Sequence, residues 1–278
     1  MILVTGATGT IGSAVVQALH DTGVPVRALV RDPTKAADRL PHGTALATGD
    51  LNDPGSVAPA LPGIAGLFLL AGYDNAEQLL ADARAAGVGH VVLLSSSSVL
   101  GTDTDNAVAR YHLAAERAVA GSGIPWTFLR PNSFMTNTLQ WKDQLDRGDT
   151  ISTQFPDVAV STIDPRDIAD VAVRAFTEPG HQLRRYRLTG PQALTPADRV
   201  GVLAEVLGRP LRAVGQTREQ THDELYATLP TEYAAAFEAF FADGVIDETT
   251  VTTTVEEVIG HPGRTFARWV SDHRAAFS

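Results

Sequence analysis

A glycine-rich turn directly follows the first apolar run of the chain. Ile2–Val4 is typical of a short buried strand, and it leads into Thr5–Gly12 and then a helical pattern. In such a strand–turn–helix unit, Gly6 permits the tight turn, Gly9 lets the main chain approach a diphosphate, and Gly12 lets the helix pack closely. The electropositive start of the helix then holds the phosphates. The turn therefore predicts dinucleotide binding, which we favour over a turn that serves packing alone.

Short apolar runs alternate with helical patterns over roughly the first 190 residues. Most runs are apolar at successive positions, as in strands buried on both faces of a parallel sheet. The predicted strands are Ile2–Val4, Val26–Val30, Ala45–Thr48, Leu67–Ala71, Val91–Ser95, Trp126–Arg130 and Tyr186–Thr189. Strand–helix alternation with short loops predicts right-handed crossovers and an α/β fold with a doubly wound parallel Rossmann sheet.

The pattern changes after residue 133 and again after residue 190. Residues 134–162 are polar and aromatic with little periodicity, whereas helical patterns dominate after Pro191, with helices predicted over 231–243 and 264–277. We expect a dinucleotide-binding Rossmann core (1–133), a substrate-side segment (134–162), a return helix and strand of the core (163–190), and a smaller, mainly helical C-terminal substrate lobe (191–278).

Composition excludes several classes of site and partner. The 278 residues include no cysteine, which excludes disulfides and thiolate metal sites, and the eight histidines form no metal-binding motif, so we expect no metal. The net charge of −10 disfavours nucleic acid as a partner. No apolar run approaches the ~20 residues that span a bilayer, and no signal-peptide pattern is present, so we expect a cytoplasmic protein without membrane contact. The sequence leaves open whether two copies of the chain form a homodimer.

The end of the second predicted strand bears on the choice of cofactor. An acidic residue at this point binds the ribose 2′-hydroxyl of NAD, whereas a guanidinium can bind the 2′-phosphate of NADP. The chain has Arg31 here, which favours NADP(H) over NAD(H), followed by Asp32, which could still serve the ribose. Lys35 is either a second phosphate contact or a residue of an exposed helix face.

Motifs spread over residues 1–191 occur in a family-specific order. They are Thr5–Gly12, Leu29–Asp32, Gly49–Leu51, His90–Ser96, Ile124–Pro131 with Phe134, Met135 and Asn137, Asp164–Ala169 and Leu188–Pro191. The chain resembles the NmrA-like branch of the atypical short-chain dehydrogenase/reductase superfamily, which includes NADPH-dependent quinone oxidoreductases. The expected cofactor contacts are Gly6, Thr8, Gly9, Thr10, Ile11, Gly12, Arg31, Asp50, Leu51, Ala71, Gly72, Ser95, Ser96 and Asn132. For Asp50, contact with the adenine and a local turn cap are about equally supported.

The resemblance also draws attention to the usual catalytic residues of the superfamily, a serine after the fifth strand and a Tyr-x-x-x-Lys motif. Ser95 and Ser96 stand at the serine position, where they could bind a substrate oxygen or satisfy backbone groups. Tyr111 lacks its lysine, because Ala115 occupies that position. An unassisted tyrosine hydroxyl is a weak acid at neutral pH, so Tyr111 is a poor candidate for the standard catalytic role.

The helix that carries Tyr111 also carries a histidine and a glutamate, as the related quinone reductases do. His112 and Glu116 are four residues apart and share one helix face. We expect Glu116 to support the His112 imidazole, which would touch the nicotinamide ribose or donate to a substrate carbonyl; an exposed helical pair is the alternative. The candidate catalytic residues are therefore His112, Ser95 and Tyr111.

The segment after the sixth predicted strand is the expected substrate side, because open α/β sheets bind ligands at the carboxyl ends of their strands. Phe134, Met135, Asn137 and Trp141 form an apolar pattern with an amide that would suit a small planar or aromatic substrate. The same aromatic residues could instead belong to the core. For Phe237, Phe240 and Phe241, core is favoured over a pocket lid.

The sequence therefore predicts an NADPH-dependent oxidoreductase that transfers a hydride to a quinone or a conjugated or aromatic carbonyl compound, with a biosynthetic tailoring reductase as a variant. Quinones need little acid catalysis, so they are compatible with the incomplete motif. The alternative is a non-catalytic NADP(H)-sensing regulatory protein of the NmrA type. An epimerase-like enzyme is disfavoured, since such enzymes normally retain both tyrosine and lysine.

Overall fold

The computed structural model describes residues 1–277 and divides into two compact units. Unit 1 consists of Met1–Ser96, Tyr111–Pro131 and Pro165–Arg187, and unit 2 of Ser97–Arg110, Asn132–Asp164 and Leu188–Ser278. Residues 97–110, which the sequence analysis placed in the Rossmann core, are thus grouped with the second unit. The other predicted domain boundaries stay predictions.

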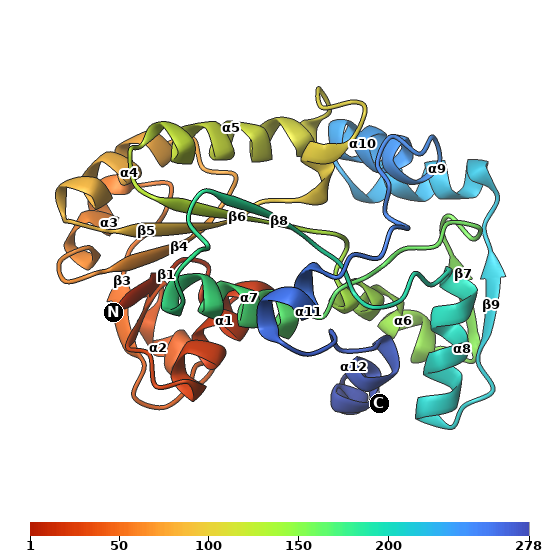
Figure 1. Ribbon diagram of the computed structural model, residues 1–278. Helices are drawn as coiled ribbons and strands as arrows, with labels where there is room; N and C mark the ends of the chain where they lie inside the picture. Colours follow the sequence, from red (N-terminus) through yellow and green to blue (C-terminus); the bar gives the residue numbers. More distant parts are fainter. Residues whose placement is uncertain (278) are drawn as a thin grey trace. The chain divides into compact units, whose positions relative to one another are not determined.

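Unit 1 is built on a seven-stranded sheet in the order β3-β2-β1-β4-β5-β6-β8 (Figure 1). The strands are β1 (Ile2–Val4), β2 (Val26–Val30), β3 (Ala45–Thr48), β4 (Gly66–Leu70), β5 (His90–Leu94), β6 (Trp126–Pro131) and β8 (Arg184–Leu188). The pairings from β3 to β6 are all parallel. The strand order reverses direction between β1 and β4, which is where such sheets bind ligands.

Helices cover both faces of this sheet (Figure 1). They are α1 (Thr10–Asp21), α2 (Pro33–Ala37), α3 (Pro54–Val57), α4 (Ala76–Ala85), α5 (Ala107–Gly121) and α7 (Pro165–Thr177), with the 3₁₀ turn η1 (Ala58–Ala60). Leu3, Leu67 and Val91 in the central strands are completely buried. The edge strand β3 is partly exposed. Burial of consecutive apolar residues on both faces confirms the doubly wound Rossmann fold predicted from the sequence.

Unit 2 is mostly helical, and it also contains a small sheet that the sequence analysis did not predict. The helical elements are η2 (Ser97–Leu100), η3 (Met135–Trp141), α6 (Lys142–Leu145), α8 (Pro196–Leu207), α9 (Arg218–Thr228), α10 (Thr231–Phe241), α11 (Thr254–Ile259), α12 (Phe266–Asp272) and η4 (Arg274–Phe277). The sheet pairs β7 (Thr150–Thr153) in parallel with β9 (Arg212–Gly215). The predicted helix over 264–277 was too long, because it divides into α12 and η4. Within residues 1–277, no helix has the length and apolarity that crossing a membrane requires.

Candidate functional site

The glycine turn of unit 1 has the geometry that its spacing predicted. Gly6 has a φ of +59°, a left-handed conformation that favours glycine. A Cβ at Gly12 would lie 2.1 Å from the Gly6 carbonyl oxygen, so only glycine lets α1 begin this close to the turn. Below the turn, the Thr5 hydroxyl donates to the Phe68 carbonyl and accepts from the Leu70 amide, which ties β1 to β4.

The first turn of α1 is open to an anion. Gly9 is the N-cap of α1 and supplies no side-chain cap, and the first turn holds no acidic residue. Thr8, Gly9 and Thr10 are exposed. Uncapped amides at the positive end of a twelve-residue helix favour negative charge, so these residues fit a dinucleotide diphosphate. Ile11, another expected contact, is buried in the core.

At the end of β2, Arg31 and Asp32 differ in whether their side chains already bind other residues. Arg31 is exposed. The Asp32 carboxylate caps α2 by accepting from the amides of Thr34 at 3.1 Å and Lys35 at 3.3 Å, and the Lys35 ammonium lies 3.5 Å from its other oxygen. Asp32 is therefore engaged locally, which reduces its availability for a ribose hydroxyl.

The residues expected to contact the cofactor after β3 and β4 lie in the turns that follow these strands. The Asp50 carboxylate accepts from the Asn52 amide at 2.9 Å and from its side chain at 3.0 Å, so it acts as a turn cap. Leu51 is buried in the core of unit 1. Ala71 is half-buried, and Gly72 has a φ of +94°. A Cβ at Gly72 would lie 3.5 Å from the Tyr111 ring, so Tyr111 stands beside the end of β4.

A buried polar cluster joins β5, α5 and β6. The Glu116 carboxylate accepts from Arg130 Nε at 2.8 Å and Nη2 at 2.6 Å, and also from Ser95 Oγ at 2.6 Å. Ser95 and Glu116 are 2% and 6% exposed. Both oxygens of Glu116 bind the guanidinium, and no hydrogen bond joins Glu116 to His112 within residues 1–277, so Glu116 does not hold the imidazole directly. Its charge still raises the pKa of His112, as expected of a supporting carboxylate. The sequence analysis gave Arg130 no role, and the available signal was a charged residue at the end of a mostly apolar, buried strand.

His112 is buried and uncharged near neutral pH. Burial lowers its pKa to about 4, despite the opposing influence of Glu116. Its Nδ1 has no hydrogen-bond partner among residues 1–277. The rings of Tyr111 and His112 lie 4.1 Å apart, centroid to centroid. Tyr111 is half-buried, as is Ser96 beyond β5.

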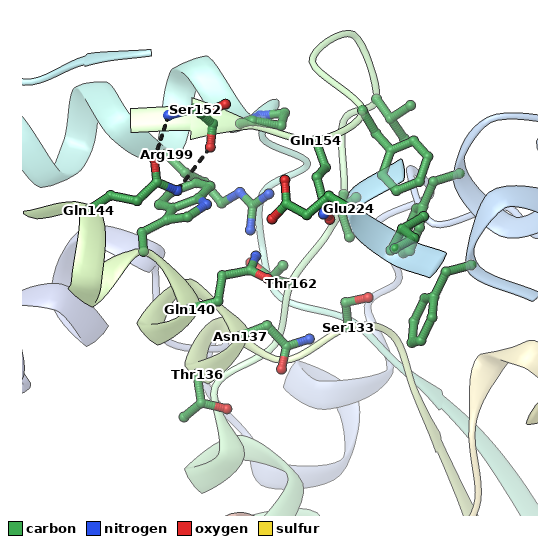
Figure 2. Close-up of a pocket in the computed structure, with 18 of the residues that line it drawn as sticks. Ser133, Thr136, Asn137, Gln140, Gln144, Ser152, Gln154, Thr162, Arg199 and Glu224 are labelled. Carbon is green, nitrogen blue, oxygen red and sulfur yellow. Dashed lines mark hydrogen bonds between the residues drawn. The ribbon is translucent and has the colours of Figure 1, made fainter. Parts of the chain in front are cut away.

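Unit 2 contains a partly open cavity of about 540 Å³ (Figure 2). Its wall is mostly amide, hydroxyl and aromatic side chains from η3, β7 and the loop that follows β7, with contributions from α8, α9 and α10. Asn137 and Trp141, two of the residues expected on the substrate side, are among those that line it, and their role stays a prediction. Met135 is 1% exposed and packs in the core of this unit, and Phe134 is not among the lining residues.

The three phenylalanines of α10 separate into two roles. Phe237 and Phe241 line the cavity, with their rings stacked 6.2 Å apart. Phe240 is 5% exposed and belongs to a small core cluster. The preference for core therefore holds for Phe240, whereas the other two rings contribute to the cavity wall.

Asn132, which we expected at the cofactor, is part of a second buried polar cluster, in unit 2. Its amide donates to Ser161 Oγ at 2.9 Å and to the Glu248 carbonyl at 3.3 Å. The Glu248 carboxylate accepts from Ser97 Oγ at 2.7 Å and from the Ser133 amide at 2.9 Å. The sequence analysis missed Glu248, and no local pattern marks it.

Comparisons with known proteins agree with this geometry. A family model described as NAD(P)H-binding matches residues 6–179. The whole chain is 38% identical to a (4-alkanoyl-5-oxo-2,5-dihydrofuran-3-yl)methyl phosphate reductase from Streptomyces griseus subsp. griseus, and 37% identical to an NAD(P)H azoreductase from Xenophilus azovorans, with 99% of each protein covered. A structure of an NADPH-dependent quinone oxidoreductase complexed with NADPH from Escherichia coli superimposes with a TM-score of 0.81 at 26% identity, over 99% of this chain and 100% of that one.

Proposed function

The chain belongs to the NAD(P)H-binding family and is an NAD(P)H-dependent oxidoreductase of the quinone reductase and azoreductase kind, and on this premise we propose that it reduces a quinone or a related conjugated carbonyl compound with NADPH. The resemblance noted in the sequence is thereby confirmed. The proposal concerns the acceptor and the form of the cofactor.

The observation that carries the proposal is that Ser95 and His112, two candidate proton donors in unit 1, are not available as strong acids. The Ser95 hydroxyl is bound to Glu116, whose carboxylate is bound to Arg130. His112, with a pKa of about 4, is neutral at pH 7. These groups are poorly suited to protonate an alkoxide. General acid catalysis contributes about 10²–10⁴-fold where it operates, so an unactivated ketone would be a slow substrate. A quinone takes up hydride readily, because its oxygens stabilise the negative charge.

The chain's own residues bind and orient the cofactor and the acceptor, and they exclude water from the site. A bound nicotinamide cofactor supplies the hydride. The open amides of the glycine turn bind the diphosphate, and the Tyr111 ring at Gly72 bounds the space beyond β4. A neutral imidazole at His112 can donate one hydrogen bond to an acceptor oxygen without losing its proton. The cavity of unit 2 supplies aromatic walls and amides that fit a planar acceptor.

The proposal that NADPH is preferred over NADH rests on Arg31 and Asp32. Arg31 is free to approach a 2′-phosphate, and a guanidinium binds phosphate in a bidentate manner. Asp32 would repel that phosphate in isolation, but its carboxylate is held by the amides of α2 and by Lys35.

The test is steady-state oxidation of NADPH with three acceptor panels: quinones, conjugated enones, and simple ketones of matched size. We expect saturable turnover with the first two and at least about 10²-fold lower kcat/KM with the third. Absence of turnover on every quinone and enone would refute the proposal. If NADPH still bound under those conditions, the sensor alternative would be favoured, and equal affinity for NADP⁺ and NADPH would support it further.

A further inference from the structure

Arg199 is a buried cation that faces the cavity of unit 2. It lies on α8, is 8% exposed, and lines the cavity together with Trp141 (Figure 2). Its Nε is buried without a hydrogen-bond partner, and its guanidinium forms no ion pair within residues 1–277. Burial lowers its pKa to about 10, which leaves the group charged at pH 7.

An unpaired buried charge is costly, so the surroundings of Arg199 are informative. The guanidinium lies 5.1 Å from the centre of the Trp141 ring, and this cation–π contact stabilises it in part. The contact also fixes the guanidinium against the cavity wall, with its N–H donors unused. Arginine that is desolvated, held in place and unpaired is suited to bind an oxyanion in a bidentate manner.

The remaining wall of the cavity does not neutralise Arg199. Apart from Arg199, Glu224 is the one charged residue among those that line it, and the others are amides, hydroxyls and apolar groups. Glu224 enters from the exposed side of α9 and accepts from the Gln216 side chain. Within residues 1–277 Glu224 forms no ion pair with Arg199 or with another cation, so the positive charge of Arg199 is left for a ligand.

We propose that the acceptor of this enzyme carries an anionic group, a phosphate monoester or a carboxylate, that Arg199 binds inside the cavity of unit 2. The identification of this ligand as the acceptor rests on the proposed function. The anion site itself rests only on the burial of Arg199, its unused donors and its position in the cavity wall.

The test is isothermal titration calorimetry with three small probes: phenyl phosphate, benzoate and neutral benzamide. The protein is saturated with NADP⁺, so that the glycine turn does not bind the anionic probes. We expect at least one anion to bind roughly tenfold or more tightly than benzamide, as one charge-assisted hydrogen bond allows. Preference for phenyl phosphate assigns a phosphate monoester, and preference for benzoate assigns a carboxylate.

Substitutions at two positions locate the site. Arg199→Gln should bring the anions and benzamide to equal affinity, whereas Arg199→Lys, which keeps the charge, should retain part of the difference. Glu224→Gln, on an exposed helix face, should tighten anion binding and leave benzamide unchanged; it tests the inference even if Arg199→Gln does not fold. Equal affinity for all probes in the unsubstituted protein, or an undiminished anion preference in Arg199→Gln, would overturn it.

The two proposals can fail separately. Anion binding that depends on Arg199, together with no turnover of any quinone or enone, would leave the anion site standing without the proposed function. Turnover of quinones without any preference for anionic probes would leave the function and remove the anion site.

Discussion

Arg130 donates to both carboxylate oxygens of Glu116, one from Nε and one from Nη2, across the interval between β6 and α5. The two side chains are 13% and 7% exposed, so the pair is largely desolvated. Ser95 adds a third hydrogen bond to the same carboxylate. The pair thus connects the ends of two strands to the helix that carries His112.

Glu116→Gln should destabilise the protein by about 3–5 kcal/mol, because it leaves the guanidinium of Arg130 buried without a counter-charge. The measurement is the free energy of unfolding in urea. As a control, Glu116→Gln combined with Arg130→Met removes both charges and should recover part of the loss. A combined variant no more stable than the single one would show that the ion pair is not the main contribution.

The His112 imidazole should make stability depend on pH between 4 and 6.5. Burial lowers its pKa in the folded protein to about 4, so the unfolded chain binds the extra proton in this window. Stability should therefore rise with pH from 4 to 6.5 and be fully present above 6.5. Two and a half pKa units correspond to roughly 3 kcal/mol at most. Urea unfolding across this range should show a steeper dependence in the unsubstituted protein than in His112→Asn; parallel curves would contradict the prediction.

Gly9→Asp should abolish cofactor binding without unfolding the protein. Gly9 has a φ of −88°, which any residue adopts, and aspartate is a favourable N-cap. Its charge, however, would face the diphosphate at the start of α1. We expect at least about a hundredfold weaker NADPH binding in a fluorescence titration. Gly9→Asn is the matched neutral control and should bind much more tightly than Gly9→Asp. Because a Cβ at Gly9 would lie 3.3 Å from the Gly6 carbonyl oxygen, both variants should lose some melting temperature, and by similar amounts.

Arg31→Gln should reduce the preference for NADPH over NADH. Loss of a charge-assisted contact to the 2′-phosphate corresponds to roughly a 10- to 100-fold fall in kcat/KM for NADPH, with little change for NADH. Lys35→Gln is the control, since this ammonium is 86% exposed and interacts with Asp32. If both variants kept the original ratio of kcat/KM values, selection of the phosphate would have to come from other residues.

Phe237 and Phe240 lie on the same helix, so substituting each one tests which ring serves the cavity and which serves the core. Phe237→Ala should raise KM for planar acceptors and cost clearly less stability than Phe240→Ala, because the ring is half-buried in the cavity wall and only packs against the edge of the core cluster. Phe240→Ala should instead cost about 3–5 kcal/mol of stability, as deletion of a buried ring does. Similar losses of stability from both substitutions would place both rings in the core.

Features that depend on local sequence were predictable, and features that depend on distant partners were not. The conformation of Gly6 and the packing of Gly12 follow from spacing within eight residues. The His112–Glu116 hypothesis relied on helix spacing too. The charge of Glu116 does raise the pKa of His112, but spacing could not show that Arg130, fourteen residues further on, takes the hydrogen bonds of the same carboxylate.

The sequence analysis missed features of unit 2 for a similar reason. β7 and β9 are four residues each and pair across about 60 residues of sequence, so neither run alone indicates a strand. Arg199 is indistinguishable in sequence from a solvated helix residue, and only its burial against Trp141 sets it apart.

The position of Glu248 in the chain has a consequence for biosynthesis. Its carboxylate accepts hydrogen bonds from Ser97 Oγ and from the Ser133 amide. Both of these residues are synthesised more than 100 residues before Glu248. Unit 1 is complete once residue 187 has emerged, whereas these earlier segments of unit 2 must wait for residue 248. Since domains tend to form in order of synthesis, unit 1 can fold on the nascent polypeptide before Glu248 has emerged, whereas the buried polar cluster of unit 2 forms only after that residue is available.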